Sequence, residues 1–305
     1  MRILLTGARG FIGRRLAAQL VGRGHAVVGV SRGGETRDQT SSVEPLVGDL
    51  LQPGEAERIV AAASADALVH LAWITEPGAF WHSPENERWL DVSRRLIQAF
   101  AAAGGSRIVV AGTCAEYAWS DEPLSEATSP LNPSTPYGRA KATLFQEMPS
   151  LVGPQRTRTA TWAWGRIFFP YGPGEQGRKF VPFVVDGLRR GERVPLTSGE
   201  QARDFLYVDD VARAFVRLVE TWTFEGAVNV ASGVATPLHD VGETLGRIAG
   251  RPDLLGWGDL PPREGDPRVV IADVTRARDE LGFEPAASLE EGLRLTWEAS
   301  RGESV

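Results

Sequence analysis

The chain has 305 residues, 42% hydrophobic and 24% charged, a composition typical of a globular protein that buries its own core. Its net charge of −6 and pI of about 5.4 argue against a general nucleic-acid binder, which is usually basic. A single cysteine excludes an intrachain disulfide, and four scattered histidines predict no metal site. The lack of a signal-like start or of an apolar run of about 18 residues predicts a cytoplasmic protein without a membrane partner.

Short apolar runs alternate with helix-like stretches through the first half of the chain. We expect strands at residues 3–6, 26–30, 67–71, 107–111 and 161–168. We expect helices between them at residues 12–23, 55–63, 84–103 and 136–148. This alternation predicts an α/β fold with a Rossmann-type doubly wound parallel sheet, covered by helices on both faces.

The second half is more broken, because glycine and proline cluster at residues 170–177, 256–262 and 265–267. It still contains a strand and a helix, followed by a short strand, at residues 204–208, 209–221 and 227–231. We therefore predict two interleaved domains. A dinucleotide-binding domain takes residues 1–164 and 203–237, and a smaller substrate-binding lobe takes residues 165–202 and 238–305.

A glycine-rich segment follows the first expected strand and opens the first expected helix. It contains Gly7, Gly10 and Gly13, with Phe11 and Ile12 between the last two. In this context the first glycine permits a tight turn, and the second lets the backbone approach a pyrophosphate at the positive end of a helix. The third lets the helix pack close to the sheet. The segment predicts a dinucleotide site; the alternative is a strand-to-helix turn that binds nothing.

This glycine spacing, with Phe-Ile after the second glycine, resembles the extended short-chain dehydrogenase/reductase superfamily, in particular its NAD-dependent epimerase/dehydratase family. The resemblance runs through most of the chain. It implies that Asp49, with Leu50 beside it, contacts the adenine of the cofactor. It also implies that Leu71 and Ala72, which follow His70 at the end of the fourth strand, line the cofactor.

The choice between NAD and NADP depends on the end of the second strand. An NAD site normally has an acidic residue there that bonds the ribose 2′-hydroxyl. This chain has Ser31 and Arg32 instead, and the Arg32 guanidinium is suited to a 2′-phosphate. The resemblance adds Arg9, at a position that NADP enzymes of the superfamily use. We therefore predict NADP(H), the alternative being that both arginines lie on the surface without a ligand.

The chain carries a Tyr-x-x-x-Lys pattern. Tyr137 and Lys141 lie four residues apart in an expected helix, which Ser134 or Thr135 can cap, so they share one helix face. A nearby ammonium favours the phenolate, so we expect Lys141, with the nicotinamide, to lower the pKa of Tyr137 toward neutrality. The resemblance adds Thr113, at the end of the fifth strand, as the hydroxyl that orients the substrate oxygen. The alternative is an ordinary surface pair on a helix.

Later segments resemble the nucleotide-sugar branch of the superfamily. There, the arginines of the Arg-Asp-Phe and Arg-x-Gly-Asp runs hold the diphosphate of the substrate, which the resemblance assigns to Arg203 and Arg263. The alternative for Arg203 is an ion pair with a neighbouring carboxylate. Lys179 lies near the start of a lobe helix and is either a nucleotide contact or solvated surface. Trp73 is a candidate apolar wall for a deoxysugar.

The fifth-strand motif discriminates between the reactions of the family. Its 4,6-dehydratases carry Thr-Asp-Glu there, whereas this chain has Thr113-Cys114-Ala115, which argues against a dehydratase. The motif resembles nucleotide-sugar 4-ketoreductases of CDP- or dTDP-deoxysugars. The resemblance therefore predicts reduction by NADPH of a keto group, at carbon 4.

Three alternatives stay open. One is a nucleotide-sugar epimerase with tightly held NAD, another a non-enzymatic NADP-binding sensor or scaffold, and the third a reductase of a ketone or aldehyde without a nucleotide. The resemblance also allows a homodimer, formed through the helices around the catalytic one.

Overall fold

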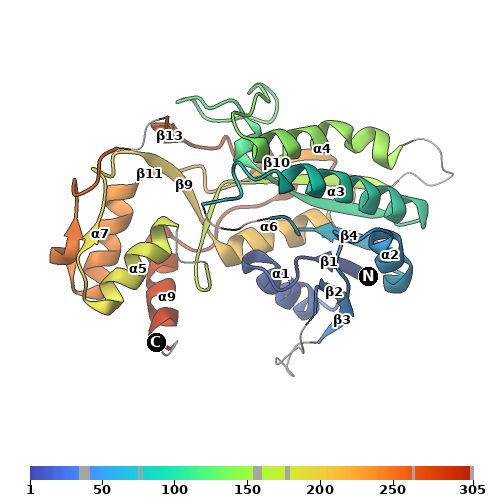
Figure 1. Cartoon of the computed structure of the whole chain (residues 1–305), viewed down its shortest axis with the longest axis horizontal. Coiled ribbons are helices and arrows are strands. Elements are labelled where there is room, and N and C mark those ends of the chain that lie inside the picture. The colour runs from blue at the N-terminus through green and yellow to red at the C-terminus, as the bar shows by residue number, and fades with distance from the viewer. Residues whose placement is uncertain are drawn as a thin grey trace.

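The computed structural model describes residues 1–33, 42–74, 76, 78–153, 160–175, 179–262 and 265–302. In these residues the larger part is a sheet of seven parallel strands in the order β10-β6-β5-β4-β1-β2-β3 (Figure 1). The strands are β1 (Arg2–Thr6), β2 (Ala26–Ser31), β3 (Val43–Val47), β4 (Ala67–His70), β5 (Arg107–Thr113), β6 (Thr161–Ile167) and β10 (Gly226–Val230). The winding direction reverses between β1 and β4, where doubly wound sheets bind their ligands at the carboxyl ends of the strands. The predicted α/β, Rossmann-type fold is confirmed.

Helices cover both faces of this sheet, as Figure 1 shows. One face carries α1 (Phe11–Gly22) and α6 (Val208–Glu220), and the other carries α2 (Glu55–Ala63), α3 (Glu85–Ala102) and α4 (Pro136–Val152). Because side chains alternate along a strand, Ile3 and Leu5 share a buried core with α1 and α6, whereas Leu4 shares one with α2, α3 and α4. The central strands are therefore apolar on both sides, as in other buried parallel sheets.

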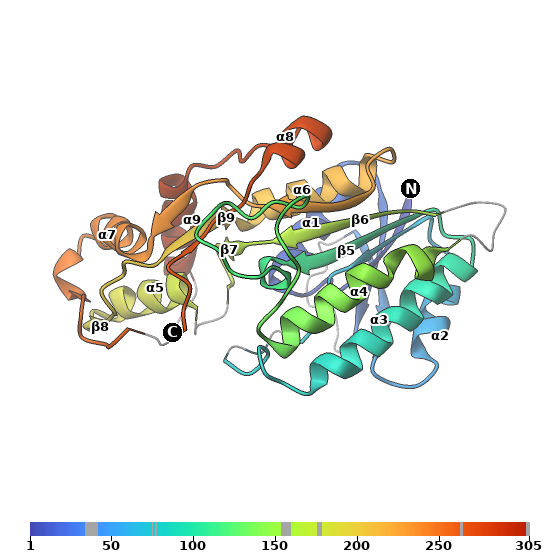
Figure 2. The same ribbon diagram turned by 90° about the horizontal axis from the view of Figure 1, so that it is seen from above.

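A smaller lobe extends from one end of the sheet (Figure 2). Its mixed sheet consists of β7 (Phe169–Tyr171), β9 (Ala202–Tyr207), β11 (Ala235–Pro237) and β13 (Val269–Val270). A short pair of strands joins β8 (Val194–Pro195) to β12 (Leu255–Gly256). The helices of this half are α5 (Phe180–Arg190), α7 (Leu238–Ala249), α8 (Thr275–Leu281) and α9 (Leu289–Gly302).

The elements expected in the first half lie within a few residues of their observed bounds. One strand was missed: β3, whose proline and charged residue hide the strand pattern at the edge of the sheet. A second strand, β9, belongs to a different sheet than expected. The sequence predicts it in the dinucleotide-binding domain, whereas it pairs with β7, β11 and β13 in the small sheet. The two-domain division itself stays a prediction.

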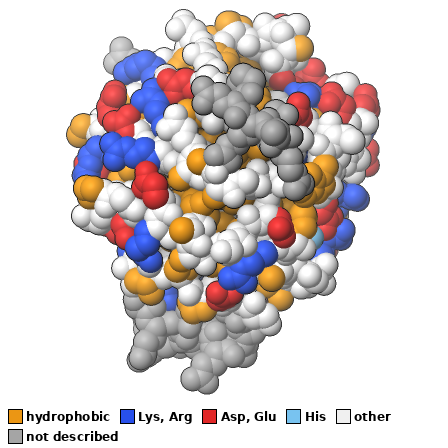
Figure 3. Space-filling view, turned by 90° about the vertical axis from the view of Figure 1, so that its right-hand side faces the viewer, with side chains coloured by type: hydrophobic (Ala, Val, Ile, Leu, Met, Phe, Trp, Pro, Cys, Tyr) orange, Lys and Arg blue, Asp and Glu red, His pale blue; other side chains and the backbone are white. Residues whose placement is uncertain are grey.

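The surface over α2 and the amino-terminal end of the chain is mixed in character. Figure 3 shows that hydrophobic side chains on this side lie in small patches, interrupted by charged side chains of both signs. Within the described ranges, the helices are too short or too polar to cross a bilayer.

Candidate active site

The glycine-rich loop between β1 and α1 forms a cradle without room for side chains. A Cβ on Gly13 would lie 2.0 Å from the carbonyl oxygen of Gly7, which itself has a φ of +71°. Gly10 is the N-cap of α1, and in the part of the chain that the structure describes no side chain caps this helix. The first N–H groups of α1 are therefore available to an anion. The loop fits the pyrophosphate of a dinucleotide.

The segment after β4 connects this loop to the catalytic helix. Backbone atoms of Leu71 and Ala72 lie 3.1 Å and 2.9 Å from the position that a Cβ on Gly7 would take. The next residue, Trp73, places the centroid of its ring 3.8 Å from the Nζ of Lys141. The segment therefore touches the dinucleotide loop at one end and a predicted catalytic residue at the other.

A buried hydrogen-bond chain fixes the end of β4. The Ser93 hydroxyl donates to the Trp89 carbonyl (2.7 Å), so the Nε2 of His70 is the donor to Ser93 (2.8 Å). The Nδ1 of His70 then accepts from the Thr6 hydroxyl (2.7 Å), which in turn accepts from the Ala72 N–H (3.2 Å). Burial lowers the pKa of His70 to about 3, so this imidazole is neutral and structural.

The residues predicted for the adenosine side lie at the carboxyl ends of β2 and β3: Ser31, Arg32, Asp49 and Leu50. Arg32 is exposed, and Arg9 of the glycine loop donates to the carbonyl of Gly33 (3.1 Å). Asp49 accepts the N–H of Leu51 (3.1 Å), which fixes its carboxylate at the turn after β3. The described residues at the end of β2 include no carboxylate, as expected from the sequence.

Thr113, Tyr137 and Lys141 come together where β5 ends and α4 begins. Thr135 caps α4 through its Oγ1, which accepts the N–H of Gly138 (3.1 Å), so one of the two predicted caps is confirmed. A Cβ on Gly138 would lie 2.2 Å from a backbone oxygen of the turn after Thr113, so only glycine lets α4 approach this closely. The Thr113 side chain is a hydrogen-bond partner of Tyr137.

Aromatic rings surround the phenol of Tyr137. The rings of Phe80 and Trp81 meet it edge to face, with centroids 5.0 Å and 5.6 Å away, and Trp73 lies at 6.4 Å. The backbone N–H of Tyr137 also donates to the Trp81 carbonyl (3.2 Å). Burial in these surroundings raises the pKa of Tyr137, and the hydrogen bond with Thr113 opposes this effect.

The expected lowering of the Tyr137 pKa by Lys141 together with the nicotinamide stays a prediction, and burial by the protein's own side chains acts in the opposite direction. The ammonium of Lys141 donates to the Ala111 carbonyl (2.8 Å) and lies on the face of Trp73, and burial dominates the pKa of the phenol. Burial also lowers the pKa of Lys141 itself, to about 7, while the charge of Glu116 opposes that shift. The lysine is thus a buried cation close to losing its proton.

Glu116 is a buried residue that the sequence did not indicate. It follows the catalytic threonine by three residues, and its carboxylate accepts the N–H groups of Thr113 (2.8 Å) and of the Trp164 indole (2.9 Å). It also pairs with Arg166 of β6 (2.7 Å), and neither side chain is more than 1% exposed. In the sequence, only the position of an acidic residue just after the fifth strand points to this contact. Its partner, Arg166, lies 50 residues further along the chain.

The predicted substrate residues do not all converge. Arg203 of β9 is buried and pairs with Asp266 (2.5 Å), which is the ion-pair alternative considered above. Lys179, the N-cap of α5, pairs with Glu175 (3.2 Å) and lies 6.0 Å from the ring centroid of Phe11. Trp73 is 8% exposed, which leaves little of it to meet a sugar. Arg263 lies outside the described residues.

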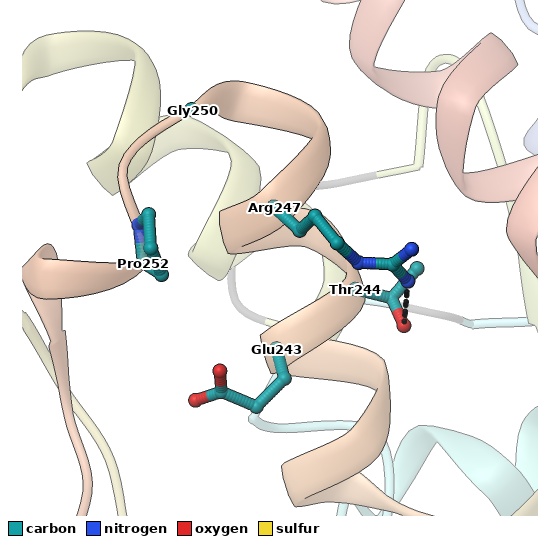
Figure 4. Close-up of a pocket in the computed structure, with 5 residues that line it drawn as sticks. All are labelled: Glu243, Thr244, Arg247, Gly250 and Pro252. Atoms are coloured by element: carbon teal, nitrogen blue, oxygen red, sulfur yellow. Dashed lines mark hydrogen bonds between the residues drawn. The ribbon is translucent and has the colours of Figure 1, made fainter.

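A separate pocket lies on the small lobe, along α7 and the turn that follows it (Figure 4). Its polar groups have partners: Arg247 contacts Thr244 (3.4 Å) and Glu290 (3.3 Å), and Glu243 accepts from the Trp257 indole (2.7 Å). It includes none of the predicted site residues. Within the described residues, no group of His, Cys, Asp or Glu side chains is arranged to hold a metal ion.

Known proteins resemble the chain over most of its length. The UDP-glucose 4-epimerase of Mycolicibacterium smegmatis is 28% identical, with 100% of both chains covered, and several further relatives share that name. The dTDP-6-deoxy-L-talose 4-dehydrogenase (NAD(+)) of Aggregatibacter actinomycetemcomitans is 28% identical over 70% of this chain and 77% of its own. The structure of MoeE5 in complex with UDP-glucose and NAD has 30% identity and a TM-score of 0.84, with 99% of both chains covered.

The family profile gives the same assignment. The NAD dependent epimerase/dehydratase family matches residues 3–231, a range that includes the glycine cradle, Thr113, Tyr137 and Lys141. Together with the fold and these residues, the match shows that the chain belongs to the NAD dependent epimerase/dehydratase family of the extended short-chain dehydrogenases/reductases.

Proposed function

We propose that this chain is an enzyme that transfers hydride at carbon 4 of the hexose in a nucleotide-activated sugar. One observation carries the proposal: Thr113, Tyr137 and Lys141 meet beside a glycine cradle at the carboxyl edge of the sheet. Carbon 4 is supported by two relatives with different net reactions, a 4-epimerase and a 4-dehydrogenase, whose names share that position.

Each residue of the trio has a separate role. The nicotinamide dinucleotide, when bound in the cradle, supplies or accepts the hydride. Tyr137 exchanges the proton of the sugar hydroxyl at the same carbon, and Thr113 orients that oxygen. Lys141 supplies positive charge beside the reacting groups. The rings of Phe80 and Trp81 pack edge to face against the phenol ring and limit how far it can move.

Epimerisation is the first candidate for the net reaction. We had considered it an alternative to reduction, and the comparisons support it better, because the relatives that match over the full length are UDP-glucose 4-epimerases. In that case hydride leaves carbon 4 and returns to its opposite face, so the cofactor is unchanged after each cycle.

Reduction of a 4-keto sugar is the second candidate. Tyr137 is protonated at neutral pH, because burial raises a pKa that is about 10 in a free tyrosine, and reduction needs a proton donor at the carbonyl oxygen. The 4-dehydrogenase relative catalyses the corresponding oxidation by its name.

The cofactor is a nicotinamide dinucleotide, and two kinds of observation bear on its type. MoeE5 was solved with NAD, and the name of the 4-dehydrogenase relative includes NAD(+), which supports NAD. The absence of a carboxylate at the described end of β2, together with exposed Arg32, supports NADP(H) for a reductase. Thermal shifts with NAD and NADP separate the two, since a ligand raises the melting temperature by mass action.

The nucleotide-sugar part of the proposal depends on Arg203. Its guanidinium is paired with Asp266, so a diphosphate must displace that carboxylate or share the arginine with it. Substrates without a nucleotide remain the alternative if this pair stays closed. Direct contacts of Lys179 and Arg263 with the nucleotide, and a homodimer, stay predictions.

The test uses purified protein and two assays. UDP-glucose is incubated with NAD and followed for UDP-galactose; a nucleotide-activated 4-keto-6-deoxyhexose is mixed with NADPH or NADH and followed at 340 nm. Epimer formation without net NADH production identifies an epimerase, and stoichiometric NAD(P)H consumption identifies a reductase. Tyr137→Phe should lower kcat by about 10²–10⁴-fold while cofactor binding persists. Full activity of this variant would refute the proposal.

A further inference from the structure

Lys141 is buried without a carboxylate partner among the described residues. It is 2% exposed, and its ammonium donates to the neutral carbonyl of Ala111 (2.8 Å). A cation taken out of water is poorly compensated by one carbonyl and the more distant charge of Glu116. Something else must help to keep the charge at this position.

Trp73 supplies that help. Its ring centroid lies 3.8 Å from the Nζ of Lys141, well within the range of a cation–π contact. Tryptophan is the best aromatic partner for a cation, and the contact is strongest where water is excluded. The ring therefore gives the ammonium a further partner besides the Ala111 carbonyl.

The indole cannot easily move away from the ammonium. Its Nε1–H donates to the Oδ1 of Asn86 (2.8 Å), and its ring stacks on Trp89 with centroids 6.2 Å apart. The amide of Asn86 in turn donates to the carbonyls of Phe80 (2.7 Å) and Ser83 (2.9 Å). The same amide thus holds the indole and the segment whose Trp81 carbonyl accepts the N–H of the catalytic tyrosine.

We propose that Trp73 is a positioning residue, whose indole face holds the ammonium of Lys141 charged and in place beside Tyr137. The contact between the indole and the ammonium does not depend on the proposed function, but its effect on catalysis rests on that function. The sequence had suggested this indole as a sugar wall, and its burial favours the role toward the lysine instead.

The proton affinity of Lys141 depends on the charged groups around it. Three titratable groups face it: Glu116 from the turn after β5, His70 from β4, and Tyr137 from α4 itself. His70 is neutral at working pH, since its pKa is about 3, and Glu116 stabilises the ammonium. Removing the indole face therefore lowers the pKa of the lysine further, and no nearby group replaces the lost contact.

The chain offers a direct measurement, because it contains only the lysines Lys141 and Lys179. Protein labelled with ¹³Cε-lysine gives two signals, and Lys179→Arg assigns them. The pH titration of the Lys141 signal reports its pKa without reference to turnover. In the wild type we expect a value far below that of a free lysine.

Trp73→Leu removes the aromatic face and should lower the measured pKa of Lys141 by about one pH unit, a tenfold change in proton affinity. Trp73→Phe keeps a weaker face and should lie between leucine and wild type. Trp73→Met, whose unbranched and flexible side chain adapts to an irregular space, is the second variant without a face if leucine prevents folding. The pH at which kcat declines should move with the titration.

Trp89→Leu is the matched control, because it removes an indole from the same cluster that stacks on Trp73 and not on Lys141. It should leave the titration of Lys141 unchanged. An unchanged pKa in Trp73→Leu or Trp73→Met, or an equal shift in the control, would overturn the proposal. If the titration shifts as expected but the protein has no activity on sugars, the contact stands and the proposed function fails.

Discussion

The buried pair of Glu116 and Arg166 should behave as one unit in folding. Its side chains are 0% and 1% exposed, and Glu116 also accepts N–H groups from Thr113 (2.8 Å) and Trp164 (2.9 Å). Arg166→Met leaves a carboxylate in the core without its cation. Removing one partner of a buried pair costs about 3–5 kcal/mol of unfolding free energy.

The double variant should be more stable than Arg166→Met alone. Glu116→Gln keeps an acceptor for Thr113 and Trp164 but turns an amide donor toward the Arg166 guanidinium, so alone it should also destabilise the protein. Glu116→Gln with Arg166→Met removes both charges at once, which is often close to neutral. We therefore expect a coupling free energy of at least about 3 kcal/mol between the two substitutions, since the double variant avoids the cost of Arg166→Met alone.

Urea unfolding of the wild type, the two single variants and the double variant, all without cofactor, measures this coupling. The midpoints and a common m-value give the free energy of unfolding of each protein. The control is Arg94→Met, which breaks a two-bond pair with Glu147 (2.6 Å and 2.7 Å) whose members are 31% and 33% exposed. That pair is partly solvated, so its loss should cost only about 0.2–1 kcal/mol. Additive costs of the two core substitutions, or equal losses in the core and control variants, would refute the reasoning.

Two further predictions concern the cofactor side of the sheet. Gly13→Ala should abolish dinucleotide binding in a thermal-shift assay, because its Cβ would lie 2.0 Å from the Gly7 carbonyl oxygen; Gly22→Ala, where no atom lies within 4 Å, should leave binding intact. The pKa of His70 falls from 6.5 to about 3 on folding, so below pH 6.5 the unfolded chain takes up a proton that the folded one does not. As the pH is lowered from 6.5 toward 3, the free energy of unfolding should therefore decrease by up to about 1.4 kcal/mol per pH unit. In urea titrations at several pH values, His70→Asn should lack this contribution to the pH dependence.

The sequence predicted the parts of the site that depend on neighbouring residues. The glycine cradle, the Thr135 cap and the helix that carries Tyr137 and Lys141 are each encoded within a few residues, where turn geometry and helix periodicity leave few choices. The first half of the sheet was predicted for the same reason, because apolar strands and helices alternate clearly there. The lobe was not resolved into elements, since its strands are only two to six residues long.

Contacts between distant segments could not be predicted. Glu116 and Arg166 are 50 residues apart, and Arg203 meets Asp266 across 63 residues. The burial of Tyr137 and Lys141 could not be predicted for a related reason: a spacing of four residues places two side chains on one helix face but does not say how buried they are. Burial raised the pKa of the phenol and lowered that of the lysine, and burial depends on the aromatic residues that fold over them.

The surroundings of the proposed catalytic trio depend on these distant contacts. Trp73, Asn86 and Trp81 come from the end of β4, the start of α3 and the segment between them, and they pack around the phenol and the ammonium. Burial raises the pKa of the phenol, which makes Tyr137 a weaker acid and, once ionised, a stronger base than a free tyrosine. Epimerisation requires one side chain both to accept and to donate a proton, whereas reduction requires only donation. An epimerase should therefore need cofactor and sugar to shift the phenol toward ionisation, and the forward and reverse pH profiles at carbon 4 should differ most where Lys141 titrates.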